Sequence, residues 1–122
     1  MILLDSNILI GYLNGDVGIV ETINELRRER RALFVSPISI AETLCMPGAT
    51  GEALIIIEQF LDGFITVYPD KTIAKTAAKI RRTYRLDIPD AFVVATAIEH
   101  GLPLATRDKK MRSVPGIVLA DI

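Results

Sequence analysis

The sequence predicts an α/β fold, a three-layer α/β/α sandwich around a parallel central sheet of roughly five strands. Short segments that are apolar throughout alternate along the chain with longer segments of helical pattern. Continuous apolar strands are typical of parallel sheets covered on both faces, and parallel neighbours need helical crossover connections. With 122 residues, half of them hydrophobic, we expect a single domain spanning residues 1–122 around one good core.

Caps and chain breakers place the elements of the first half. Serine, aspartate and asparagine favour the position before a helix, and glycine or proline ends one. Ser6 can cap the first helix, which would leave Asp5, at the end of the first strand, free for another role. The expected elements are a strand at 2–4, a helix at 6–13, a helix from residue 16, a strand at 33–35, a helix from 36 to about 46 and a helix at 51–62.

The second half continues the alternation. Asp70 can cap one helix and Asp87 the next, in which Pro89 fits the first turn. That second helix is apolar almost all round, so we expect it to be buried. The expected elements are a strand at 64–68, a helix from 70 to near 84, a helix from 87 to about 100, a strand at 104–106, a short helix near 109 and a strand at 117–119.

Composition excludes several classes of protein. No apolar run approaches the roughly 20 residues that span a bilayer, and the first residues lack the basic segment of a signal peptide, so we expect a cytoplasmic protein. Cys45 is the only cysteine and His100 the only histidine, which excludes an internal disulfide and the usual zinc sites. A Ser-His-Asp triad would need His100, whose place before Gly101 is better explained as the end of a helix.

Basic residues are unevenly distributed, although the net charge is only −1. All of them fall within three segments, residues 27–31, 71–85 and 107–112. In the middle segment, Lys71, Lys75 and Lys79 recur every four residues and therefore share one helix face. Arg82 extends this face, which is either simply solvated or a substrate-binding track for the phosphate backbone of RNA.

Four carboxylates lie where the predicted fold brings strand ends and helix starts together. Asp5 and Asp108 each follow a strand. Glu42 points from an apolar part of its helix, and Asp90 faces inward in the first turn of the buried helix. Each has a plainer explanation by itself, namely a helix cap, the rim of the core, dipole stabilisation or a solvated loop. Sites of parallel α/β folds lie beyond the carboxyl ends of the strands, so we expect the four to converge there.

Converging carboxylates favour a divalent cation. Carboxylates brought close repel one another, and a bound cation removes that penalty. A ligand set of oxygens alone, without histidine or cysteine, selects Mg²⁺ or Mn²⁺. Mg²⁺ favours sites that phosphate oxygens complete, which indicates phosphate esters as substrates, and the metal can activate a water for hydrolysis.

Four segments in order resemble the motifs of the PIN-domain family, in particular its VapC-type toxin endonucleases. They are residues 3–10, 36–42, 86–97 and 104–108. The resemblance implies a metal-dependent endoribonuclease with Mg²⁺ or Mn²⁺ as cofactor, the toxin of a toxin–antitoxin pair. The catalytic metal ligands that it implies are Asp5, Glu42, Asp90 and Asp108, with supporting roles for the Thr106 hydroxyl and for Asn7. It also implies a small antitoxin protein as partner and a homodimer.

Two further interpretations remain open, and two others fail at single positions. A PIN-fold scaffold that binds RNA or protein without cutting, and a PIN nuclease of RNA maturation, both fit the same motifs. An aspartyl phosphatase would need a second aspartate at position 7, where the chain has Asn7. The glycines at 48 and 51 lack the Gly-Lys-Ser/Thr sequence of a phosphate-binding loop.

The first two predicted helices are rich in aliphatic side chains. Most of these belong to the core, but a helical hairpin of this kind can also leave a groove for an amphipathic segment of the antitoxin. The residues concerned are Ile8, Ile10, Tyr12, Leu13 and Ile19. An acidic site beside such a groove would attract an inhibitory arginine of the partner.

Overall fold

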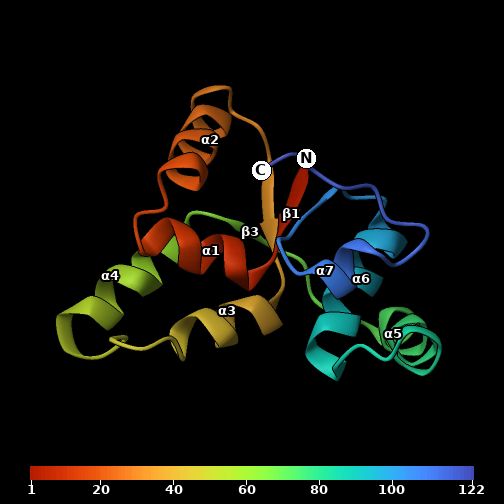
Figure 1. Ribbon diagram of the computed structural model, residues 1–122. Helices are drawn as coiled ribbons and strands as arrows, with labels where there is room; N and C mark the ends of the chain where they lie inside the picture. The colour runs from red at the N-terminus through yellow and green to blue at the C-terminus, as the bar shows by residue number, and fades with distance from the viewer.

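The computed structural model describes residues 1–122 and contains a parallel sheet of four strands in the order β3-β2-β1-β4. The strands are β1 (Ile2–Leu4), β2 (Leu33–Val35), β3 (Ile65–Thr66) and β4 (Leu104–Ala105). Leu3 of β1 is in register with Phe34 on one side and with Leu104 on the other. Because all pairs are parallel, the carboxyl ends of the strands lie at one edge of the sheet (Figure 1).

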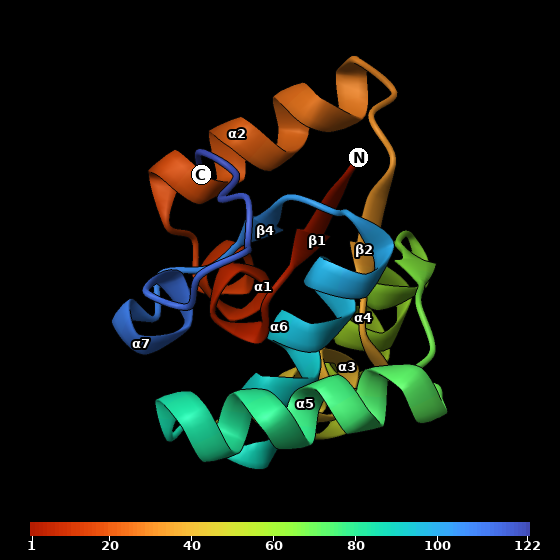
Figure 2. The same ribbon diagram turned by 90° about the vertical axis from the view of Figure 1, so that its right-hand side faces the viewer.

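Helices surround this sheet on two sides and at its carboxyl edge. They are α1 (Ser6–Leu13), α2 (Val17–Arg28), α3 (Pro37–Leu44), α4 (Gly51–Asp62), α5 (Lys71–Tyr84), α6 (Ile88–His100) and α7 (Lys109–Arg112). In Figure 1, α1, α2 and α4 lie on one side of the strands, α5, α6 and α7 lie on the other, and α3 lies below the strand ends. Figure 2 views the molecule from the side of α5 and α6. The predicted three-layer α/β/α architecture is confirmed.

Alternate residues of β1 supply the two halves of the core. The side chain of Leu3 packs among buried residues of α5 and α6, such as Ile73 and Val94. Its neighbours Ile2 and Leu4 point the other way and pack among buried residues of α1 and α2. Successive strand side chains point to opposite faces, so a strand that is apolar throughout contributes to both layers. The expected burial of α6 is confirmed as well.

The predicted fifth strand at residues 117–119 is wrong as a full strand. Only Leu119 forms an isolated parallel bridge, to Leu104 of the edge strand β4. The side chains of Val118 and Leu119 are 65% and 38% exposed, and only Ile117 of this segment packs against the core. An edge segment without cover gains little from burial and pairs only briefly. The expectation of about five strands is therefore approximate, because the sheet has four.

Several element boundaries and two caps also differ from the prediction. The strand expected at 64–68 contains only Ile65–Thr66, and the helix expected to reach about residue 46 ends at Leu44. Asp5 rather than Ser6 caps α1, since the Ser6 backbone N–H donates to Asp5 Oδ1 at 2.8 Å. Asp87 precedes α6 but makes no capping hydrogen bond with its side chain. No helix in the structure combines the length and apolar character needed to cross a bilayer.

Candidate metal centre

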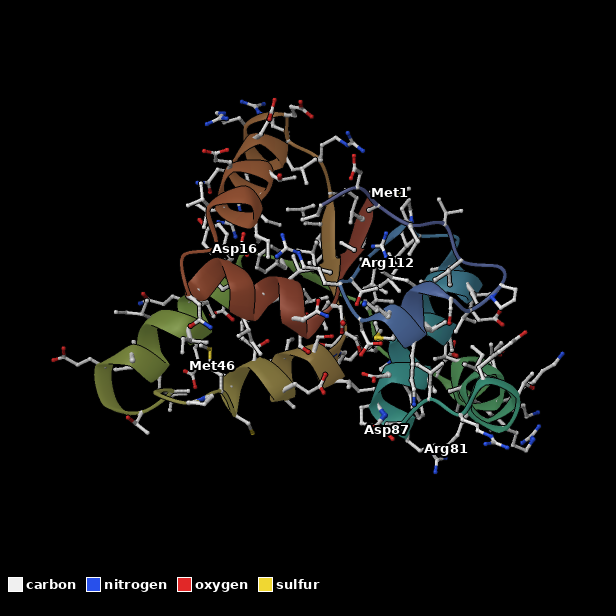
Figure 3. The ribbon with its side chains drawn as sticks, in the orientation of Figure 1. Met1, Asp16, Met46, Arg81, Asp87 and Arg112 are labelled. Carbon is white, nitrogen blue, oxygen red and sulfur yellow. The ribbon has the colours of Figure 1, made fainter.

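Four acidic residues lie at the carboxyl edge of the sheet, each on a different segment. Asp5 follows β1, and Glu42 belongs to α3. Asp90 lies in the first turn of α6, and Asp108 is the residue before α7. Figure 3 shows side-chain oxygens gathered between α1, α3, α6 and α7, just beyond the strand ends. The fold thus brings together the residues that the sequence singles out.

Asp5 is the most deeply buried of the four, with 3% of its surface exposed. Its two carboxylate oxygens accept different hydrogen bonds, one from the Ser6 backbone N–H and one from the Thr106 hydroxyl, each at 2.8 Å. Burial raises the pKa of Asp5 above its ordinary value, and these hydrogen bonds oppose the rise. The nearby charges of Glu42 and Asp108 raise the pKa further. Asp5 is therefore held in one orientation, while burial and the neighbouring negative charges destabilise its ionised form.

The Thr106 hydroxyl connects Asp5 to the other side of the site. It donates to Asp5 Oδ2 and accepts from the Asp108 backbone N–H at 3.1 Å. It also accepts from Asn7 Nδ2 at 3.2 Å. Asn7 Oδ1 in turn accepts from the Arg107 backbone N–H at 3.3 Å. The two residues expected to support the acids therefore join the segment after β4 to the start of α1.

Asp108 caps α7 with its side chain. Its Oδ1 accepts from the Met111 backbone N–H at 3.1 Å, at the start of α7. Carboxylates are favoured at this position because they satisfy unpaired helix N–H groups. The bond engages Oδ1, and no side-chain donor within hydrogen-bond distance of Oδ2 is found, so this oxygen remains available to a ligand.

Glu42 carries the clearest sign of a missing ligand. Its Oε1 is buried and has no hydrogen-bond partner in the structure. Burial raises the pKa of Glu42, the Ser6 side chain lowers it, and the charge of Asp90 raises it again. A buried carboxylate oxygen without a partner is costly, because its lost hydration is not replaced. A cation or a cation-bound water at this atom would remove that cost.

Asp90 has the most perturbed acidity of the group. Burial first, and then the charges of Asp5, Asp108 and Asp87, raise the pKa of Asp90 to about 6. Mutual raising of pKa values among several acids is the expected result of crowding like charges in a partly buried place. Perturbed acids of this kind cluster at functional sites.

The donor set fits a hydrated hard cation. No three aspartate, glutamate, histidine or cysteine side chains lie close enough to enclose an ion by themselves. Mg²⁺ keeps several waters and is usually held by one or two carboxylates together with substrate phosphates. Glu42 Oε1 offers such an ion a free ligand oxygen, and the acids around Asp90 offer it negative charge. Oxygen donors alone also match Mg²⁺ and Mn²⁺ rather than zinc.

An ion pair that the sequence did not predict holds one side of this site. Arg107 Nη1 lies 2.9 Å from Asp16 Oδ2, and Asp16 also caps α2 through the Ile19 backbone N–H. That hydrogen bond, followed by the one from Arg107, lowers the pKa of Asp16. The pair ties the residue before Asp108 to the start of α2. Its partners are separated by 91 positions, and no local pattern connects them.

The basic side chains expected to bind RNA fall into two groups on α5. Lys71, Lys75 and Lys79 are exposed on the side of the helix away from the buried Ile73. Arg82 lines a pocket at the end of α5 that also includes residues at the start of α6. The pocket of Arg82 includes the start of α6, where Asp90 lies, whereas Lys79 lines a different pocket with Ile98, near the other end of α6.

Fold and site together define an α/β domain with an acidic centre at the carboxyl edge of a parallel sheet. A family model described as PIN domain matches residues 2–117, and the chain belongs to this family. The resemblance found in the sequence motifs is thereby confirmed. No curated protein matches the chain.

Several solved structures are similar to this chain over nearly its whole length. A toxin–antitoxin complex from Klebsiella pneumoniae is 29% identical, with a TM-score of 0.81 over 97% of this chain and 96% of that chain. VapBC2 from Rickettsia felis, bound to a DNA fragment from its promoter, is 17% identical, with a TM-score of 0.82 over 98% of each chain. DNA-bound VapBC from Salmonella typhimurium is 22% identical, with a TM-score of 0.79 over 99% of this chain and 98% of that chain. At their lower identities the last two show the fold alone.

Proposed function

We propose that this chain is a metal-dependent endoribonuclease and the toxin of a toxin–antitoxin pair. The proposal is carried by the coupled, partly buried carboxylates at the carboxyl edge of the sheet in a chain of the PIN domain family. Such carboxylates favour a hard cation, and a hydrated Mg²⁺ or Mn²⁺ favours phosphate oxygens. The toxin role is supported by the likeness to the Klebsiella pneumoniae complex.

The residues that would hold the ion are Asp5, Glu42, Asp90 and Asp108. When bound, Mg²⁺ or Mn²⁺ activates a water and neutralises charge on the scissile phosphate. Asp5 needs no reordering, because Ser6 and Thr106 already fix both its oxygens. Glu42 offers an oxygen with no competing partner. Asp90, with its pKa raised to about 6, would be held in its carboxylate form by a bound cation.

The decisive experiment is cleavage of RNA by the purified full chain. We expect RNA to be cut in Mg²⁺ or Mn²⁺, and not in excess chelator, with 5′-phosphate and 3′-hydroxyl products. Asp5→Asn and Asp90→Asn should each slow cleavage by at least about 100-fold, since each removes a metal ligand. Asp62→Asn is a matched control, because Asp62 is an exposed acid on α4 outside the site. Undiminished cleavage in chelator, or by Asp5→Asn, would refute the proposal.

The same assay distinguishes the two alternatives. A PIN-fold scaffold would bind RNA and leave it intact with either ion. A nuclease of RNA maturation would cut one precursor at a defined position and spare unrelated RNA. Matched single-stranded DNA belongs in the assay, because cleavage of DNA at the same rate would contradict specificity for RNA.

We also propose that the antitoxin covers an apolar hollow between the end of α1 and α4. Its lining residues are Leu13, Met46, Pro47, Gly48, Ala53, Ile56 and Ile57. The Ile55 and Ile56 side chains are 57% and 62% exposed beside it. Contiguous exposed aliphatic side chains mark interaction surfaces, and an amphipathic helix suits a groove of this kind. The assembly of the Klebsiella pneumoniae relative with an antitoxin supports this choice of partner.

This hollow differs from the groove that the sequence suggested within the first two helices. Ile8 and Ile19 are 0% and 1% exposed and belong to the core. The Tyr12 ring stacks on Phe60 at 4.8 Å between centroids, and its hydroxyl donates to Asn24. Of the suggested residues, only Leu13 lines the hollow. A homodimer remains part of the proposal, and light scattering of the purified chain tests it.

A further inference from the structure

Three arginines surround one pocket where α5 ends and α6 begins. The residues that line this arginine pocket, which has a volume of about 580 Å³, are Ala78, Arg81, Arg82, Arg85, Asp87 and Ile88. In Figure 3, Arg81 and Asp87 lie beside one another at the lower edge of the molecule. Three positive charges against one negative charge leave the pocket with a net charge of +2.

The arginines of the pocket have no acidic partner. The ion pairs of the structure join Arg31 to Glu29 and Arg107 to Asp16, and neither involves the pocket. Arg81 is anchored, because its Nη1 donates to the Leu86 backbone carbonyl at 2.8 Å. Guanidinium groups gathered without carboxylates suit an anion with several oxygens, since each can donate two parallel hydrogen bonds.

Arg85 is placed at the pocket by an uncommon backbone conformation. It ends α5 with φ 59° and ψ 35°, the left-handed region that favours glycine. The conformation reverses the chain between the two helices and leaves the Arg85 side chain exposed. Arg30 follows α2 in the same conformation, at φ 57°, but lines none of the pockets of the structure. It therefore provides a matched comparison.

The pocket adjoins the metal centre through the first turn of α6. Asp87 in the pocket and Asp90 in the metal centre are three residues apart and so lie on the same side of that turn. The lysines of α5 have no such connection to the acids. Side chains three residues apart on a helix have Cβ atoms about 5–6 Å apart, so a strand of RNA bound at the acids would run close to the pocket.

We propose that Arg81, Arg82 and Arg85 bind a backbone phosphate of the RNA next to the scissile one. The inference rests on the proposed function and adds the element that positions the strand. Phosphate contacts of this kind fix the register of a nucleic acid without reading its sequence. The arginine pocket thus replaces the lysine face of α5 as the main backbone contact.

The test is RNA binding by variants of the uncleaving Asp5→Asn chain. The probe is a fluorescein-labelled single-stranded RNA of twelve mixed nucleotides, followed by anisotropy over a series of salt concentrations. Arg82→Gln and Arg85→Gly should each weaken binding by about three- to tenfold and reduce the log–log salt slope by about 0.7, the loss of one phosphate contact. Arg28→Gln at the end of α2 and Arg30→Gly just after it remove the same charges away from the pocket and should leave both quantities unchanged.

Stability and kinetics separate this inference from structural damage and from the proposed function. Arg85→Gly should melt no lower than its parent, since glycine relieves the left-handed conformation. Equal losses in the α2 controls, or unchanged affinity in both pocket variants, would overturn the inference.

In the cleaving chain, Arg82→Gln should raise KM with little change in kcat. If the Arg82→Gln chain cuts RNA with an unchanged KM, the phosphate-binding role of the pocket is refuted and the proposed nuclease activity is retained. If nothing is cut but the pocket variants bind less RNA, the pocket stands and the nuclease fails.

Discussion

The Thr106 hydroxyl shows how one residue can organise a site without being a ligand. It is 1% exposed and holds Asp5, Asn7 and the backbone of Asp108 at once. A carboxylate that is already oriented loses less freedom when it binds a cation, so such hydroxyls raise affinity indirectly. The hydrogen bond to Asp5 also lowers a pKa that burial would otherwise raise further.

We therefore predict that Thr106→Val weakens Mn²⁺ binding by about 10- to 100-fold, as loss of an orienting partner typically does. Valine keeps the shape of threonine but leaves Asp5 Oδ2 and the Asp108 N–H without their partner. Thr106→Ser retains the hydroxyl and should bind Mn²⁺ nearly as well as the parent chain. Calorimetric titration with Mn²⁺ measures both. Equal affinities of the valine and serine variants would show that the hydroxyl does not act through Asp5.

The raised pKa of Asp90 makes the stability of the metal-free chain depend on pH. In the folded chain the pKa is about 6, above the ordinary value of an unfolded aspartate. Between these two values the folded chain holds a proton that the unfolded chain has lost, so the free energy of unfolding falls as pH rises. This contribution is fully present below the unfolded pKa and is lost as pH rises through about 6.

We accordingly predict that Tm in excess chelator falls more steeply for the parent chain than for Asp90→Asn between about pH 4.5 and 7, since only the parent titrates at this position. The comparison of the two chains cancels the acids that both share. Mg²⁺ should restore the Tm of the parent above pH 6 and do little below it, because protons compete with the ion. Parallel pH profiles of the two chains in chelator would show that Asp90 is not perturbed in solution.

Local sequence signals predicted most helices and strands. Whether the remaining segments form regular structure depends on how other parts of the chain pack against them. The helix that Asp70 caps runs from Lys71 to Tyr84, as the cap and the apolar spacing predict. The strand expected at 117–119 is reduced to one bridge because Val118 and Leu119 are exposed and only Ile117 packs against the core, which no local pattern reports. The sequence left the cap of the first helix open between Asp5 and Ser6, because both adjacent residues suit the position.

The acidic site was predictable to a similar extent. Asp5, Asp90 and Asp108 stood out because each follows a strand or begins a helix, and Glu42 stood out because it lies on an apolar part of its helix. The unpaired oxygen of Glu42 and the Arg107–Asp16 pair depend on how distant segments pack, so the sequence alone could not show them. The lysine face of α5 was prominent in sequence because its spacing is regular, whereas the arginine pocket forms only where two helices meet.

The exposed isoleucines of α4 lead to a prediction about the partner. Ile56→Asp places a charge at the apolar hollow, where a partner's aliphatic side chain would leave it without water. The cognate antitoxin, co-expressed with the chain, should then be lost from pull-down while RNA cleavage stays unchanged. Val118→Asp is the control, because Val118 is similarly exposed, at 65%, but does not line the hollow and lies beside the edge strand β4. Retention of the antitoxin by Ile56→Asp would place its binding site elsewhere.

Across the whole molecule, charge is divided between an acidic centre and a basic flank. The four acids lie beyond the strand ends, and the arginine pocket opens beside them at the junction of α5 and α6. A near-neutral total therefore hides a surface that can attract a polyanion and a centre that repels it without a cation. RNA and metal should each bind more tightly in the presence of the other, because the phosphate oxygens complete the coordination of the cation and the cation neutralises the charge of the phosphate.

A nuclease that needs only an abundant cation would act on the RNA of the cell that makes it. We therefore predict that expression of the parent chain in a bacterial host arrests growth, and that Asp5→Asn at equal protein level does not. Asp5→Asn keeps a side chain that can cap α1, so loss of toxicity reports loss of the metal ligand rather than of the fold. Asp62→Asn should arrest growth as the parent does. Growth curves after induction, with immunoblots for protein level, measure the effect. Normal growth with the parent chain would end the toxin proposal, while cleavage of RNA by the purified chain would still establish the nuclease.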